Sequence, residues 1–148
     1  MTITYPEITN LIMATDALRA SLSSEKAEQL RVLDADLTLA LWQLIPQAAS
    51  WLSYRCPGLT LTDPGVPTIN ADTDAEDSPA VVFTVDRRLA DLKAPTVVAA
   101  LAWRVMHLYL LALDGRAAVD ALSTAVSYTE AIHALTLAPI PPRTPRWY

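Results

Sequence analysis

Apolar residues recur at spacings of three and four along most of the chain, which is the pattern of amphipathic α-helices. This spacing predicts a first helix over residues 7–22 and a second helix from residue 24 to about residue 56. Pro46 lies inside the second helix and predicts a kink or a break near residues 44–45, because proline cannot donate to the helical hydrogen-bond ladder. Gly58 follows a proline and ends the element.

The pattern changes between residues 57 and 86, where prolines, glycines and carboxylates replace the helical periodicity. We expect a long acidic loop in this region. A short strand is predicted at residues 59–62, and a second at residues 80–85, whose β-branched and aromatic side chains favour β-structure. One or two helical turns are expected at residues 87–93.

Two further helices are predicted towards the C-terminus. The first covers residues 96–113, with Pro95 at its N-terminus and Gly115 as the C′ residue after its last turn. The second covers residues 116–137 and is rich in alanine. The residues expected to face the core from this last helix are Val119, Leu122, Val126, Ile132 and Leu135.

These elements predict a mainly α fold class: a small helical bundle with a long acidic loop, one or two short strands and an extended proline-rich arm. A chain of 148 residues is long enough for one domain with its own core. We expect that domain at residues 1–138, with the long loop at residues 57–86. Four prolines exclude a helix at residues 139–148, which we expect to form the extended arm.

The predicted helix at residues 96–113 is apolar on nearly all sides, and such a helix must be buried on nearly all sides. Arg104 near its middle argues against a membrane span, because an arginine at a bilayer centre costs about 2.5–3.5 kcal/mol on insertion scales. We therefore predict that neighbouring copies of the chain help to cover it, through Trp103, Met106 and Leu110. The alternative is a compact monomer with this helix at its centre.

Composition and charge exclude several classes of protein. With 11 basic and 16 acidic residues the net charge is −5, which argues against a sequence-independent DNA binder, since that function needs a basic face. The three glycines lie too far apart for a phosphate-binding loop, and one cysteine cannot form an intrachain disulfide. The first ten residues lack the features of a secretory signal, so we expect synthesis in the cytoplasm.

No group of residues in the sequence predicts catalysis, a metal site or a cofactor. His107 and His133 have no second ligand three or four residues away, so both are interpreted as structural. Cys56 is interpreted as an inert thiol. The acidic run at residues 72–77 lacks the glycine and the final glutamate of an EF-hand loop. We therefore expect that the chain is not an enzyme.

The C-terminal arm has the composition of a docking segment. Arginine, tryptophan and tyrosine are the residue types most enriched in interface hot spots, and prolines lower the entropy lost when a segment docks. We expect the arm to bind a neighbouring copy or another protein, and the alternative is a frayed terminus. The candidate contact residues are Arg143, Arg146, Trp147 and Tyr148.

Two segments carry a resemblance to a known family. Residues 34–58, DADLTLALWQLIPQAASWLSYRCPG, combine an acidic start, an alanine-rich helix and an aromatic and basic end before a turn. Residues 94–109, APTVVAALAWRVMHLY, place a proline before an apolar run that ends near histidine and tyrosine. Both segments resemble helices of the head-to-tail connector (adaptor) proteins of tailed double-stranded DNA phages. The first 33 residues and Pro46 depart from the family's pattern.

The resemblance implies a dodecameric ring that docks beneath the portal in the neck of the virion and continues the DNA channel, without catalysis. DNA would pass through without specific binding, because an acidic wall repels it. The resemblance also implies that the terminal arm contacts the portal. The residues implied to line the channel, or to meet the next neck or tail component, are Asp72, Asp74, Glu76 and Asp77.

Three alternatives remain open from the sequence. The chain could be another neck protein, such as a stopper or a tail terminator, although those proteins tend to contain more strand. It could be a small helical regulatory or partner-binding module that acts as a dimer. It could also be an enzyme with a site that the sequence does not reveal. Symmetry separates the first two classes, since a ring favours a connector and a closed dimer favours a module.

Overall fold

A computed structural model describes residues 1–20, 35–67 and 78–137 of the chain. These residues form four α-helices, a short 3₁₀ helix and a three-stranded antiparallel sheet, which confirms the predicted mainly α fold class. The elements in chain order are β1 (Thr2–Thr4), α1 (Tyr5–Ala20), α3 (Ala35–Arg55), β2 (Leu59–Asp63), β3 (Ala80–Val85), η2 (Arg87–Leu89), α4 (Ala94–Leu110) and α5 (Gly115–Leu137).

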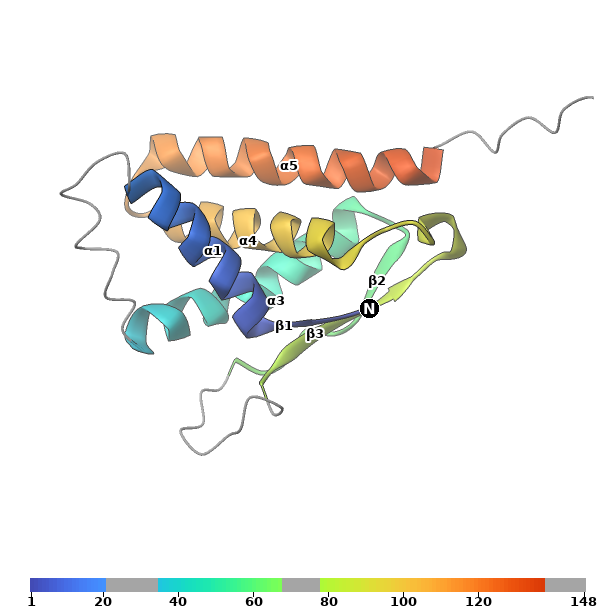
Figure 1. Ribbon diagram of the computed structural model, residues 1–148, viewed down its shortest axis with the longest axis horizontal. Helices are drawn as coiled ribbons and strands as arrows, with labels where there is room; N and C mark the ends of the chain where they lie inside the picture. Colours follow the sequence, from blue (N-terminus) through green and yellow to red (C-terminus); the bar gives the residue numbers. More distant parts are fainter. Residues whose placement is uncertain (21–34, 68–77, 138–148) are drawn as a thin grey trace, which may run out of the picture.

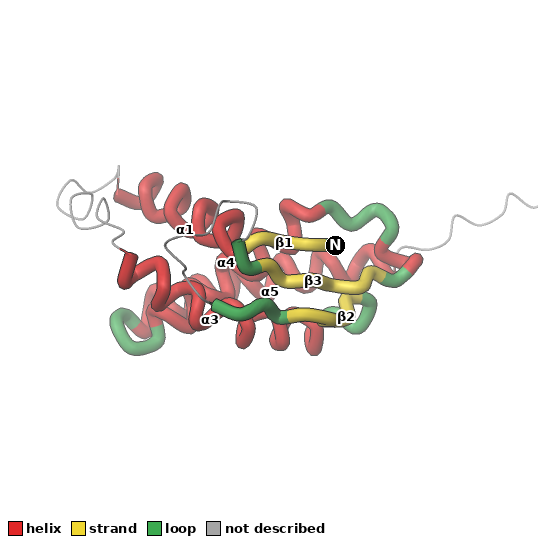
Figure 2. The backbone as a smooth tube through the Cα atoms, turned by 90° about the horizontal axis from the view of Figure 1, so that it is seen from below, coloured by secondary structure: helices red, strands yellow, loops and turns green. Residues whose placement is uncertain are grey.

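Helix α4 lies at the centre of the fold. Helix α5 packs along one side of α4, while α1 and α3 contact α4 elsewhere on its surface (Figure 1). The sheet lies on the side of α4 that faces away from α5, as the view from below in Figure 2 shows. Its strand order is β1-β3-β2, so β3 pairs with a neighbour on each edge. Helix α5, the helices α1, α3 and α4, and the sheet all contribute apolar side chains to one continuous core.

Strand β1 is a feature that the sequence did not predict. Its three residues pair with β3 in the register Thr2↔Val82 and Thr4↔Ala80. The pairing extends to Met1, because the backbone N–H of Phe83 donates to the Met1 carbonyl at 2.8 Å and the Met1 nitrogen donates to the Phe83 carbonyl at 2.9 Å. A three-residue strand is too short to show the alternating pattern of a β-strand. Pairing with β3 therefore accounts for this strand, and its own sequence does not reveal it. The predicted strands near residues 59–62 and 80–85 are both present.

Pro46 does not break α3, which corrects the break that the sequence allowed near residues 44–45; the kink stays a prediction. The helix runs from Ala35 to Arg55 with Pro46 inside it. Ile45 before the proline and Ala48, Ala49 and Leu52 after it are fully buried. An internal proline costs about 3 kcal/mol. Burying a large aliphatic side chain yields about 1.5–3 kcal/mol, so the packing of several such residues outweighs that cost.

The boundary between α4 and α5 also differs from the sequence prediction. Helix α4 ends at Leu110, three residues before the predicted end, and Gly115 begins α5 instead of following α4 as a C′ residue. The cause is Asp114, whose Oδ1 accepts hydrogen bonds from the backbone N–H groups of Arg116 (3.1 Å) and Ala117 (3.3 Å). A carboxylate in this position satisfies two N–H groups that a helix leaves unpaired at its start.

The core-facing side of α5 is rotated from the predicted one. Val119 and Leu135 are exposed, Leu122 and Val126 are half-buried, and of the predicted set Ile132 alone is fully buried. The other residues that α5 buries are small or polar: Ala118, Ala121, Ala125 and Thr129. Small side chains let α5 approach α4 closely, so shape, and not hydrophobicity alone, decides which side of this helix is buried.

A series of buried polar contacts ties α1 to α3 and to the segment after β2. The Tyr5 hydroxyl donates to the carbonyl of Pro64 at 2.7 Å, and its ring meets the Trp42 ring edge-on at 5.6 Å between centroids. The Trp42 Nε1–H donates to the Thr9 hydroxyl at 2.8 Å, and that hydroxyl donates to the Tyr5 carbonyl at 3.0 Å. Each buried polar group in this series therefore has a partner, as burial requires.

Candidate functional site

His107 has a structural contact in the α4–α5 interface. Its side chain is buried, and Nδ1 lies 2.8 Å from the backbone carbonyl oxygen of Ala118 on α5. A carbonyl oxygen can only accept, so Nδ1 carries the proton and donates. The imidazole thereby joins α4 to α5, which is the structural role that the sequence predicted. His133 lies exposed on α5.

Cys56 is enclosed at the end of α3. Its side chain is buried, and Sγ lies 3.7 Å from the carbonyl oxygen of Thr129 on α5. Burial raises the pKa of the thiol from 9.0 to about 11, and the neighbouring Arg55 opposes this shift. A thiol with a raised pKa is a poor nucleophile at neutral pH, which agrees with the predicted inert thiol.

Stability is expected to fall at alkaline pH, because burial raises the pKa of Cys56 to about 11 and that of Tyr5 to about 12, where nearby Asp63 adds to the shift. Between the ordinary and the raised pKa values, the unfolded chain has lost protons that the folded chain keeps, so the free energy of unfolding decreases as pH rises. Below about pH 8 these two groups contribute no slope.

Urea unfolding between about pH 8 and pH 11 measures this slope. The Cys56→Ala variant should show a shallower decrease than the unmodified chain over this range, because only Tyr5 then remains. An unchanged slope in Cys56→Ala would contradict the assignment of the shift to the buried thiol.

Arg104 is held against α3 and is half-buried. Its guanidinium carbon lies 4.7 Å from the centroid of the Trp51 ring, a cation–π contact. Burial lowers the pKa of Arg104, and its Nε is buried with no hydrogen-bond partner among the described residues. This charge therefore stabilises the packing of α4 on α3 through the face of an aromatic ring.

The described residues contain neither a metal-binding group nor a helix that could span a membrane. Across residues 1–20, 35–67 and 78–137, no three His, Cys, Asp or Glu side chains gather as a metal-binding group would require. Within the same ranges no helix combines the length and the apolarity that crossing a bilayer demands.

The predicted contact residues of the apolar helix occupy different environments. Met106 is buried in the core, whereas Trp103 and Leu110 are half-buried and pack against it. The other candidate residues, those of the arm and of the acidic loop, lie outside the described residues: Asp72, Asp74, Glu76, Asp77, Arg143, Arg146, Trp147 and Tyr148.

Helix α4 is covered mostly by other helices of its own chain, whereas the sequence predicted that neighbouring copies help to cover it. Eight of its 17 residues are buried, seven are half-buried, and α1, α3 and α5 all pack against it. The premise that this helix needs identical copies to shelter it therefore does not hold for most of its surface. Association between copies stays a prediction and must rest on another surface.

Such a surface lies at the turn between α4 and α5. Leu111, Leu113 and Val119 are 57%, 67% and 64% exposed, and they fall within nine residues of one another. Two exposed carboxylates, Asp114 and Asp120, belong to the same stretch. We call these five residues the turn patch. The sequence pattern does not reveal the turn patch, because it places Leu113 in the buried helix and Val119 in the core.

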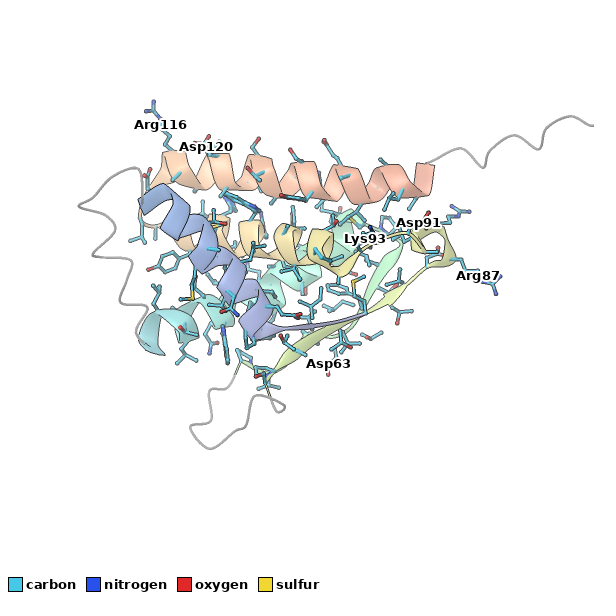
Figure 3. The ribbon with its side chains drawn as sticks, viewed as in Figure 1. Asp63, Arg87, Asp91, Lys93, Arg116 and Asp120 are labelled. Atoms are coloured by element: carbon cyan, nitrogen blue, oxygen red, sulfur yellow. The ribbon has the colours of Figure 1, made fainter. Side chains whose placement is uncertain are left out.

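Two charged segments flank the α4–α5 pair, and their net charges differ in sign. Figure 3 shows Arg116 and Asp120 at the start of α5, and Arg87, Asp91 and Lys93 near its other end. Residues 111–120 contain two acidic residues and one basic residue, a net charge of −1. Residues 86–93 contain three basic and two acidic residues, a net charge of +1. All of these charged side chains are exposed.

Comparisons with protein families, with curated proteins and with solved structures gave no match to this chain. The fold and the turn patch define a small, mainly α-helical protein with an exposed apolar and acidic end. The resemblance to phage adaptors rests on the sequence motifs at residues 34–58 and 94–109.

Proposed function

We propose that this chain is a structural protein of the neck of a tailed phage: a head-to-tail adaptor whose copies form a ring beneath the portal and extend the DNA channel. The observation that carries the proposal is the resemblance at residues 34–58 and 94–109. These segments contain α3 and nearly all of α4, and the two helices pack against each other. The resemblance therefore concerns a central unit of the fold and not scattered positions.

The charge of the chain supports this proposal. A net charge of −5 suits the wall of a channel, because like charges keep packaged DNA from adhering as it passes. In the proposed ring, Asp72, Asp74, Glu76 and Asp77 face the channel or the next neck component. DNA then passes without base-specific contacts, and no cofactor is needed.

The turn patch supports association between copies. Exposed large apolar residues that cluster are characteristic of interaction sites, whereas scattered ones are ordinary. Three of the eight exposed large apolar residues found among the described residues lie between Leu111 and Val119. The C-terminal arm, with Arg143, Arg146, Trp147 and Tyr148, is proposed to bind within the same assembly, to the portal or to a neighbouring copy.

A second candidate is a small helical partner-binding module that acts as a dimer. The observation that favours it is the cover that α4 receives from its own chain, since a fold of this kind does not require a ring. A dimer with twofold symmetry uses the same patch on both copies, whereas a ring joins two different patches. The symmetry of the assembly therefore separates the two candidates.

Electron microscopy of the full chain mixed with a candidate portal tests the proposal. The expected result is a ring of additional density on the face of the portal from which DNA leaves, coaxial with its channel. Portal particles imaged alone are the control. Unchanged portal particles, together with a chain that elutes separately as a monomer or a closed dimer, would contradict the adaptor function.

A further inference from the structure

The turn patch combines apolar and acidic groups in a way that calls for a particular partner. Leu111, Leu113 and Val119 expose aliphatic surface, and Asp114 and Asp120 add two carboxylates beside it. Asp114 is already engaged by two backbone N–H groups of α5, so its side chain has a fixed position. A partner that fits this patch carries aromatic or aliphatic groups together with cations.

The C-terminal segment of this same chain has that composition. Residues 138–148, which lie beyond the described end of α5, contain two arginines, a tryptophan, a tyrosine and no acidic residue. Their net side-chain charge is +2, opposite to the net charge of −1 over residues 111–120. The end of α5 from which the segment departs contacts η2, whose surroundings at residues 86–93 have a net charge of +1. The segment is therefore attracted more strongly to residues 111–120 than to residues 86–93.

Length decides whether the segment can reach the turn patch of its own chain. The patch lies at the start of α5 and the segment begins after Leu137, at the opposite end of the helix (Figure 1). At 1.5 Å per residue, Val119 lies about 27 Å from Leu137 along α5, and the start of the helix lies about 33 Å from it. Eleven residues in a proline-type extended chain span about 34 Å, so only the last residues of the segment could reach Val119 of their own chain, and they could not also cover Leu111 and Leu113. Arg143, six residues on, reaches at most about 22 Å.

We propose that residues 138–148 of one copy dock on the turn patch of the next copy, so that this contact links the copies head to tail. Donor and acceptor lie at opposite ends of α5, so the contact is heterologous: it generates a ring when the rotation closes and a filament when it does not. This inference adds a contact between copies to the proposed function. It rests on that proposed function for the location of the contact in a phage neck. It replaces the burial of α4 as the physical basis for association.

A matched pair of valine substitutions in the full chain tests the docking surface. Val119→Ser removes an apolar side chain from the turn patch, and Val66→Ser removes an equally exposed one, 67% against 64%, from the segment after β2. Sedimentation velocity over a concentration series should show association weakened about tenfold or more in Val119→Ser, since burying one valine is worth at least that factor. Val66→Ser should associate as the unmodified chain does. Equal association of all three proteins would overturn the proposal.

Mixing two defective full-length chains tests the head-to-tail geometry. A patch variant, Leu113→Ser with Val119→Ser, keeps its arm, and an arm variant, Trp147→Ala with Tyr148→Ala, keeps its patch. Each alone should remain monomeric, and the mixture should form a one-to-one pair that does not grow, because one arm and one patch are left. Assembly of either variant alone to the size of the unmodified chain would overturn the inference. An unmodified chain that assembles in this way but leaves the portal unoccupied would contradict the proposed function alone.

Discussion

Replacing Trp42 by alanine is expected to lower the free energy of unfolding by about 3–5 kcal/mol, because the substitution removes a buried indole from the junction of α1 and α3. Trp42 is 9% exposed, meets the Tyr5 ring edge-on and donates from Nε1 to the Thr9 hydroxyl at 2.8 Å. The loss includes the cavity, the aromatic contact and the hydrogen bond. Urea unfolding followed by tyrosine and residual tryptophan fluorescence measures it.

Trp42→Phe is the matched control for this prediction. Phenylalanine keeps an aromatic ring beside Tyr5 but cannot donate to Thr9, so about 1 kcal/mol should be lost to the hydrogen bond, in addition to a smaller cavity. The Thr9 hydroxyl keeps its bond to the Tyr5 carbonyl. Equal stability of Trp42→Ala and the unmodified chain would show that α1 does not pack on α3 as described.

The second large effect is expected from the buried side of α5. Ala121 is fully buried, so Ala121→Glu places a carboxylate without a partner in the core and should cost several kcal/mol, enough to unfold a domain of ordinary stability. Val119→Glu, two residues earlier, changes an exposed position near the start of the helix. Because this side chain is exposed, the free energy of unfolding should stay within about 0.5 kcal/mol.

Circular dichroism during thermal unfolding of the two glutamate variants decides which side of α5 is buried. The structure predicts that, at concentrations where the chain is monomeric, Val119→Glu melts with the unmodified chain and Ala121→Glu has lost the cooperative transition. The sequence pattern alone predicts the reverse for Val119, which it assigned to the core. A cooperative transition in Ala121→Glu together with unfolding of Val119→Glu would contradict the observed orientation of the helix.

Local patterns along the chain were sufficient for the fold class. The helices, the strands at residues 59–63 and 80–85 and the turn at Gly58 follow from side-chain spacing and from residues that terminate elements. Gly58 is also enclosed, since a Cβ atom there would lie 2.6 Å from the Leu89 side chain. Such signals depend on a few consecutive residues, and packing between distant elements does not change them.

Features that depend on long-range contacts could not be predicted in the same way. Strand β1 exists because β3 offers it an edge, and α3 passes through Pro46 because neighbouring side chains hold it in place. In α5, alanines and larger apolar residues occur on different sides, so hydrophobicity alone favoured the wrong side. Shape complementarity with α4 selects Ala121 and Ala125, and no pattern within α5 reveals that choice.

The cover of helix α4 by its own chain could not be predicted, for the same physical reason. The helix predicted at residues 96–113 is apolar on nearly all sides, and this led to the prediction that other copies cover it. The structure covers most of α4 with α1, α3 and α5, and leaves Leu111, Leu113 and Val119 exposed. The sequence predicts the arm residues as a contact site, and this stays a prediction. It does not predict the turn patch, since exposure at the α4–α5 turn follows from the early end of α4.

Native mass spectrometry of the full chain, over a range of concentrations and with a candidate portal added, tests the central claim most directly. The account predicts assemblies of more than two copies that close at one defined number, alone or on the portal. A single chain under every condition, or a closed dimer that ignores the portal, would contradict it.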